Sequence, residues 1–147
     1  MFPDRFTIMK LSLATLVGMP LVALIFDQFS ESVDLAAAIT GFVPLWRQLL
    51  AGIILGVGGA AIAHIVIAMP FMQKVNVKYS NMLGHFDLGW NEILFVSFCA
   101  GVGEELLFRG ALQPLMGIPL TSVFFVAIHG YLNPTDWRIS VYGIALT

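Results

Sequence analysis

Long and almost uncharged apolar runs constrain the fold of this chain more than any other feature. A transmembrane helix needs about 20 consecutive apolar residues, and two runs reach that length, at about Phe6–Phe26 and Leu49–Met69. Of the 147 residues, 59% are hydrophobic and 11% charged, and the mean hydropathy is +0.90. So short a soluble chain could not bury this excess of apolar side chain. The sequence therefore predicts a membrane protein and excludes a soluble enzyme, a disordered tail and a disulfide-built secreted module.

Three more helical segments follow the first two spans. We expect a third hydrophobic helix at about Trp90–Leu115 and a fourth at about Ile118–Leu132, ended by Asn133-Pro134. A fifth apolar run begins at Ile139 and reaches only about half a spanning length at Thr147, from which we expect a C-terminally truncated chain. The predicted fold class is an all-α, multi-pass transmembrane bundle with about four full spans and a truncated fifth.

Polar segments between the spans set the expected topology. The distribution of Lys and Arg places the N-terminus and the connector Gln73–Gly89 in the cytoplasm, and the acidic linker Asp27–Arg47 outside. Glu104 then lies about 21 Å along the third helix from Trp90, at 1.5 Å per residue, which is deep for a site that opens to the cytoplasm. An inverted topology and a partly re-entrant connector therefore stay open as alternatives. For the first span, a cleaved signal peptide is the rival interpretation.

The second span is rich in small residues. Gly52 and Gly56 form a G-x-x-x-G motif, which lets helix backbones approach closely in lipid. Its small residues include Gly52, Gly56, Gly58, Gly59, Ala60, Ala61 and Ala63. We interpret them as residues for internal packing rather than for dimerisation.

Several isolated side chains carry no motif. We interpret Cys99 as a small buried hydrophobe, because a single cysteine cannot form an internal disulfide. No role follows for His64 or His85. Glu92 lies near the expected membrane interface, where we expect it to be solvated.

Three charges interrupt the third helix, at Glu104, Glu105 and Arg109. Each charge in mid-membrane costs roughly 2.5–3.5 kcal/mol on insertion scales, so such a cluster must be paired or face a protected interior. Glu105 and Arg109 are four residues apart and within reach of a salt bridge. Glu104 is turned about 100° away from Glu105, toward another helix. Its expected partner there is His129, followed by Gly130, which would admit a close approach.

This cluster has three interpretations. A carboxylate in a cleft of low dielectric has a raised pKa, which suits a general acid or base near neutral pH. Glu104 and His129 facing one water could therefore activate it for attack on a carbonyl. Alternatively, the four side chains form a structural clamp between helices, or the carboxylates carry protons in an ion-coupled transporter.

Other chemistries fit the sequence less well. The zinc motif H-E-x-x-H is absent, and Ser97 and Ser122 lack the glycine-flanked setting of a serine nucleophile. Residues 101–104 echo the G-x-G-D of aspartyl intramembrane proteases, but with Glu for Asp and no second intramembrane Asp. We predict no cofactor and no metal ligands, although a divalent metal stays an open alternative. The net charge of −2, without a basic stripe, argues against a nucleic-acid partner.

At these residues the sequence resembles the CAAX-protease and bacteriocin-processing family, also called the Abi family of intramembrane proteases. The family motif E-E-x-x-x-R corresponds to Glu104–Arg109, and F-x-x-x-H corresponds to Phe125–His129. The resemblance covers about Asn91–Thr147. We accordingly expect N-terminal spans and a connector over residues 1–89, and a partial catalytic domain over residues 90–147.

The resemblance implies a glutamate-dependent endopeptidase. Glu104 would be the base and His129 its partner in activating water, while Glu105 and Arg109 would shape and neutralise the site. Implied partners are the lipid bilayer and a peptide or prenylated protein substrate, since the family includes enzymes that trim CAAX proteins. Bacterial members are tied to bacteriocin processing and immunity, from which we expect a bacterial plasma-membrane location.

One family motif is missing. The family's third motif, H-x-x-x-N, supplies donors to the oxyanion from a later helix. Asn133 has the right spacing from His129, but His129 already belongs to the second motif. Because loss of one oxyanion donor typically costs about 10²–10³ in rate, we expect the printed chain alone to be weak or inactive. The alternative function is a non-catalytic immunity or scaffold protein that keeps the cluster as a clamp.

Overall fold

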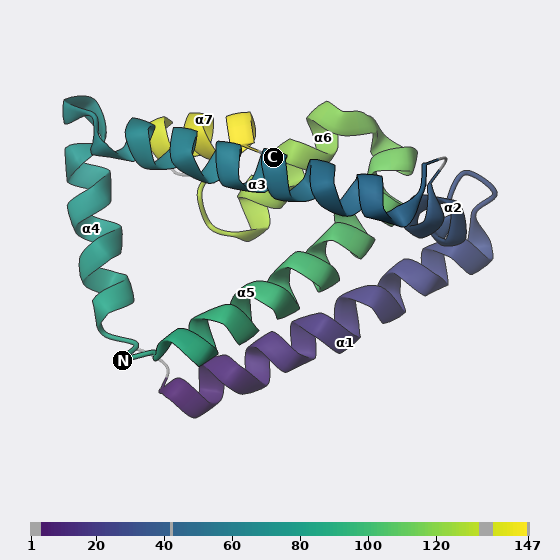
Figure 1. The fold of residues 1–147 in the computed structure, drawn as a ribbon, viewed down its shortest axis with the longest axis horizontal. Coiled ribbons are helices and arrows are strands. Elements are labelled where there is room, and N and C mark those ends of the chain that lie inside the picture. Colours follow the sequence, from purple (N-terminus) through teal and green to yellow (C-terminus); the bar gives the residue numbers. More distant parts are fainter. Residues whose placement is uncertain (1–3, 42, 133–136, 147) are drawn as a thin grey trace. The chain divides into compact units, whose positions relative to one another are not determined.

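The computed structural model describes residues 4–41, 43–132 and 137–146, and all of its regular elements in these ranges are helices. In chain order they are α1 (Arg5–Phe29), α2 (Leu35–Thr40), α3 (Leu45–Ala68), η1 (Pro70–Met72), α4 (Gln73–Gly84), α5 (Trp90–Glu104), η2 (Glu105–Leu112), α6 (Gln113–Ile128) and α7 (Trp137–Leu146). Figure 1 labels the α-helices along the ribbon. The predicted all-α class is confirmed.

Three helices in the described ranges are long and apolar enough to cross a membrane. They are α1, α3 and the 39-residue stretch Trp90–Ile128. That third stretch holds both the third and the fourth predicted spans, and its backbone is non-helical at Gly117 (φ 78°, ψ 163°), where the prediction divided them. The multi-pass membrane fold is confirmed, but four predicted full spans correspond to three long helices.

The polar segments between the long helices are themselves partly helical. Helix α4 occupies most of the predicted connector, and α2 lies in the acidic linker. Within the linker, the Asp27 carboxylate accepts a hydrogen bond from the backbone N–H of Leu35 (2.8 Å), at the first residue of α2. This bond ties the end of α1 to the start of α2.

The chain divides into two compact units. The first combines Met1–Ile39 with Leu83–Thr121, and the second combines Thr40–Met82 with Ser122–Thr147. Each unit is assembled from two separate stretches of sequence. The expected division into residues 1–89 and 90–147 was based on resemblance to a protein family and not on contacts within the chain, and it stays a prediction.

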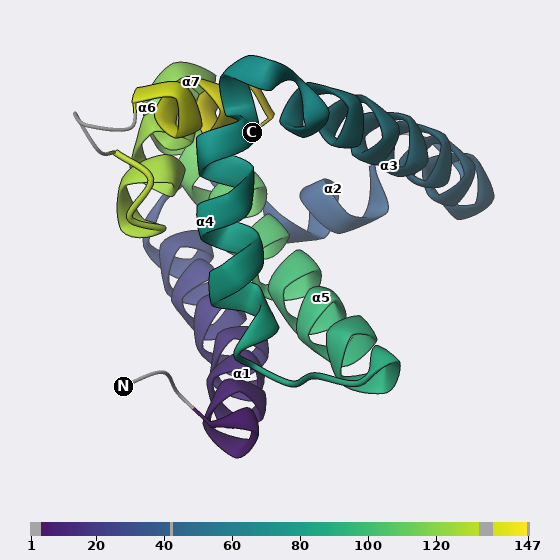
Figure 2. The same ribbon diagram turned by 90° about the vertical axis from the view of Figure 1, so that its left-hand side faces the viewer.

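In the first unit, α1 and α5 run side by side in the same direction (Figures 1 and 2). Arg5 pairs with Glu92 where both helices begin, and further along the backbone of Thr15 lies against Gly103. Near the far end, Ala23 of α1 shares a buried apolar cluster with Ala111 of η2. The starts of α1 and α5 therefore lie at the same end of this unit.

The prediction that Glu92 is solvated is wrong. Its side chain is 15% exposed and forms a 2.5 Å ion pair with the Nε of Arg5. The same carboxylate accepts a hydrogen bond from the backbone N–H of Gly89 (2.6 Å). Glu92 thus both stabilises the first turn of α5, where an acidic side chain suits the helix dipole, and holds the starts of two helices together.

The second unit has its own small core. Met72, Val75 and Ile139 are buried together, and Tyr142 packs against them. The hydroxyl of Tyr142 donates to the backbone carbonyl of Ala63 on α3 (3.3 Å), so α7 contacts α3. Helix α3 itself has no buried residue.

Candidate functional site

The acidic cluster lies where α5 passes into η2. Arg109 Nε lies 3.1 Å from Glu105 Oε2, which confirms the predicted ion pair four residues apart. The two side chains are 60% and 54% exposed, respectively, so this pair is only partly shielded. Glu104, the last residue of α5, is half-buried.

The helix that carries this pair has π geometry, which the sequence analysis did not predict. Residues Glu105–Leu112 form a π-helix, and at its end the N–H of Gln113 bonds the carbonyl of Phe108, five residues earlier. Such i→i+5 segments are rare and occur frequently at functional sites. Residue spacing alone gave no signal for it, because the i,i+4 ion pair is compatible with either helix type.

Two glycines flank the cluster and fix its surroundings. A Cβ added to Gly103 would lie 2.6 Å from the backbone oxygen of Thr15, and one added to Gly110 would lie 2.8 Å from Leu35 Cδ2. The Gly103 contact is with backbone, which cannot move aside as a side chain can. Residue 103 must therefore lack a side chain for α5 to reach α1, and this contact positions Glu104, the next residue.

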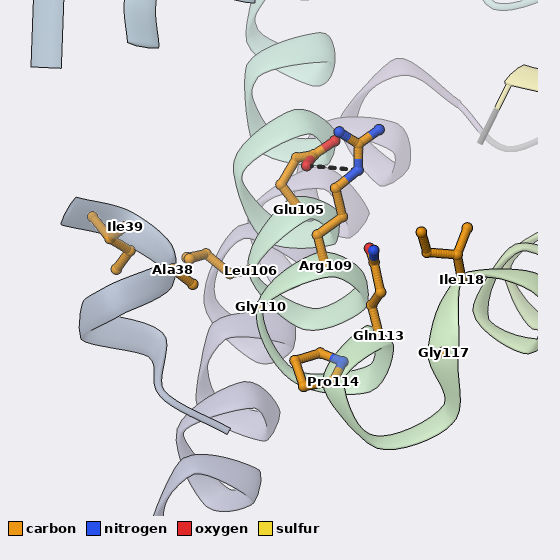
Figure 3. Close-up of a pocket in the computed structure, with 10 residues that line it drawn as sticks. All are labelled: Ala38, Ile39, Glu105, Leu106, Arg109, Gly110, Gln113, Pro114, Gly117 and Ile118. Atoms are coloured by element: carbon orange, nitrogen blue, oxygen red, sulfur yellow. Dashed lines mark ion pairs between the residues drawn. The ribbon is translucent and has the colours of Figure 1, made fainter. Parts of the chain in front are cut away.

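A pocket of about 680 Å³ lies beside the ion pair (Figure 3). It is formed by α2, η2 and the beginning of α6. Its lining residues are Ala38, Ile39, Glu105, Leu106, Arg109, Gly110, Gln113, Pro114, Gly117 and Ile118. The polar lining side chains are Glu105, Arg109 and Gln113, and Glu104 is not among them.

Gln113 is a candidate that the sequence analysis missed. It continues the spacing of Glu105 and Arg109 by four more residues, and Figure 3 shows the three side chains in one row along the helix. This regular spacing of polar residues in an apolar stretch was the available signal. It was overlooked because Gln113 carries no charge.

His129 lies at the C-terminal end of α6. Its Nδ1 is 2.8 Å from the backbone carbonyl of Phe125, and its ring stacks on the Phe125 ring at 4.2 Å between centroids. Because a carbonyl can only accept, Nδ1 carries the proton in this contact. In the neutral ring Nε2 therefore bears the lone pair, the form that a base or acceptor of a water proton needs.

The turn after His129 requires glycine at position 130 because of its backbone conformation. Gly130 has φ +71°, and the N–H groups of Tyr131 and Gly130 bond the carbonyls of Val126 and Ala127, at 3.0 Å each. This is a Schellman cap, in which glycine takes the left-handed position. A Cβ at Gly130 would meet nothing within 4 Å. Within its own compact unit, the conformation of Gly130 is therefore the reason for glycine, and the expected close approach of the helix that carries Glu104 stays a prediction.

The predicted site residues are distributed over both compact units. Glu104, Glu105 and Arg109 belong to the first unit, and His129 belongs to the second. The structure brings Glu105 and Arg109 together, whereas the pairing of Glu104 with His129 stays a prediction. Asn133, the literal fit to a third motif, lies outside the described residues. In the described ranges, no three His, Cys, Asp or Glu side chains lie close enough to hold a metal ion.

Comparison with known proteins yields one match. Neither a curated protein nor a solved structure matches the chain. One family model does, described as Type II CAAX prenyl endopeptidase Rce1-like, over residues 86–147. This segment contains both motifs, from Glu104 to Arg109 and from Phe125 to His129. The match supports a CAAX-protease-like function in general terms, and it confirms the resemblance of residues 86–147 to the CAAX-protease family.

Proposed function

We propose that this protein is a glutamate-dependent intramembrane endopeptidase of the CAAX prenyl protease type. One observation carries the proposal: the paired acidic residues of an apolar helix lie inside the matched segment, next to a glycine packed on the backbone of α1. Charged residues inside membrane helices are costly and mark functional sites by default. A purely lipid-facing helix would have no reason to keep them.

In the proposed reaction, Glu104 is the general base. Its carboxylate takes a proton from water, and the resulting hydroxide attacks the carbonyl carbon of the scissile peptide bond. When the C–N bond breaks, the leaving amine takes the proton back from Glu104. His129 assists by a hydrogen bond from the water to Nε2, a role that the protonation of Nδ1 supports.

Glu105 and Arg109 act on the site without taking part in proton transfer. Their ion pair neutralises one of two adjacent carboxylates, so that Glu104 does not face an unbalanced second negative charge. The substrate is a peptide or protein at the membrane, prenylated or not. We further propose a bacterial plasma-membrane location and a role in bacteriocin processing or immunity. The proposal requires no metal ion.

The test is cleavage of a reporter peptide by the full-length protein, as encoded, in lipid vesicles. Glu104→Ala and His129→Ala should each abolish cleavage. Glu31→Ala, which removes an exposed carboxylate in the acidic linker, is the matched control and should leave the rate unchanged. Folded yield is measured for each variant. Unchanged cleavage in both site variants would refute the mechanism.

The observed ion pair also favours a second candidate function, a non-catalytic scaffold in which the cluster is a clamp. In that case Glu105→Ala and Arg109→Ala should lower the folded yield, Glu104→Gln should not, and no reporter peptide should be cleaved. The same set of variants therefore separates the two functions.

A further inference from the structure

The pocket beside the Glu105–Arg109 pair contains polar groups that the ion pair does not use. Arg109 contacts Glu105 through Nε. Within the described part of the chain, Glu105 is the partner found for Arg109, and the side-chain amide of Gln113 has none. Figure 3 shows both side chains at the pocket, with Ile118 facing them. The pocket therefore offers several donors and one amide acceptor to an occupant.

The charge of the pocket indicates what kind of group would bind. Glu105 compensates the charge of Arg109, so the lining has no net charge. An anion that approached Arg109 would also approach the Glu105 carboxylate, which repels it. A neutral group that both accepts and donates hydrogen bonds suits Arg109 and Gln113 better, and a peptide amide has this chemistry.

The remaining walls are apolar. Leu106, Pro114 and Ile118 lie around the polar row. The volume of about 680 Å³ lies in the range of about 300–1,000 Å³ typical of pockets that hold small ligands. The walls thus match an apolar side chain carried by a peptide whose main chain bonds the polar row.

We infer that this pocket binds a neutral stretch of peptide, with Gln113 and Arg109 bonding its main chain and Ile118 contacting an apolar side chain. The inference rests on the proposed function and deepens it, because it assigns a substrate-binding subsite next to the acidic cluster. Gln113 is the residue that it adds. Recognition through the main chain predicts that binding tolerates different apolar sequences.

Binding can be measured without cleavage. For this measurement, the Glu104→Gln variant of the full-length protein is placed in lipid nanodiscs. The probe is a fluorescently labelled tetrapeptide of leucine and alanine with an acetylated N-terminus and an amidated C-terminus. We expect saturable binding, weakened roughly five- to tenfold by Gln113→Leu, the effect of about one lost hydrogen bond. Ile118→Trp, which fills the pocket from an exposed position, should also weaken it. Gln73→Leu, an exposed glutamine on α4, is the matched control.

Each outcome decides the inference. Unchanged affinity in Gln113→Leu and Ile118→Trp, or no saturable binding of the probe, would overturn it. Anion binding would overturn it as well. This would be seen as binding of inorganic phosphate, or of the same peptide with a free carboxylate, that is tighter than binding of the probe and is abolished by Gln113→Leu. Failure of the peptidase proposal would look different. The probe would bind as expected, but proteins that keep Glu104 would cleave no peptide.

Discussion

Two long apolar helices of this protein carry glycines with opposite uses. Helix α3 holds Gly52, Gly56, Gly58 and Gly59, and a Cβ added to any of them would meet nothing within 4 Å. The α5–η2 stretch holds Gly103, against which the Thr15 backbone lies so closely that a Cβ would collide. Within the second compact unit, the packing expected at the glycines of α3 is therefore not found.

In this protein, a packed site in an apolar helix coincides with charged residues rather than with a run of glycines. A stripe of small residues permits close packing but does not create it, because the partner surface decides. In the α5–η2 stretch the glycine is next to charges that are expensive in lipid, and the charges mark where the helix needs a protein neighbour. Charge among apolar residues was thus a better guide to the packed face than glycine content.

A bulky side chain at Gly103 should destabilise the protein more than any other change considered below. Gly103→Val places a branched side chain against the Thr15 backbone, and we expect it to lower the free energy of unfolding by about 3 kcal/mol. The matched variant Gly58→Val in α3 should change it by less than about 0.5 kcal/mol. Thermal or denaturant unfolding in detergent micelles measures both. Equal losses would show that the two helices do not differ in packing.

Gly130 differs from both of these kinds of glycine. Gly130 has open space around it but a φ of +71°, so its role is conformational. Gly130→Ala should cost about 1 kcal/mol, while Gly130→Asn should cost less, because asparagine tolerates left-handed backbone. The same unfolding measurement applies. If asparagine were as harmful as alanine, the cap would not be the reason for glycine.

The ion pair of η2 should contribute less than either glycine. A double-mutant cycle with Glu105→Gln and Arg109→Gln should give a coupling of about 0.5 kcal/mol, as for helix pairs four residues apart, because more than half of each side chain is exposed. A coupling above about 2 kcal/mol would instead indicate a fully shielded pair.

The smallest effect concerns the start of α1, the helix on which α5 packs. Hydrogen bonds from the side chain and backbone of Thr7 lower the pKa of the Asp4 carboxyl below its usual 3.8. The stabilisation from Asp4 is therefore present above the unfolded pKa and is lost as the pH falls through the folded pKa. Asp4→Ala should be slightly less stable than the natural chain at pH 7 and equally stable in strong acid. A pH-independent difference would contradict this role. Helix α3 differs from α1 here, because no side chain caps its N-terminus.

The sequence predicted those features that depend on local spacing. The spanning helices follow from the length of apolar runs and the Glu105–Arg109 pair from a four-residue separation, and the break at Gly117 falls between the predicted helices Trp90–Leu115 and Ile118–Leu132. These are properties of one helix, so no knowledge of its neighbours was needed.

Features that depend on a neighbouring helix could not be predicted. The close contact at Gly103 depends on Thr15, which lies 88 residues earlier. Glu92 was expected to be solvated because it lies near the membrane interface, whereas its partner Arg5 comes from another helix, α1. The π-helix also escaped prediction, because no residue pattern in this segment distinguishes it from an α-helix.

The central claim is that Glu104 performs the chemistry while Glu105 supports it. The most direct test compares Glu104→Gln with Glu105→Gln in the full-length protein, measuring kcat/KM on a reporter peptide in lipid vesicles and the folded yield of the same samples. We predict that Glu104→Gln loses at least about 10²-fold in kcat/KM at unchanged folded yield, and that Glu105→Gln retains measurable cleavage. Equal losses in the two variants, or full activity of Glu104→Gln, would contradict the claim.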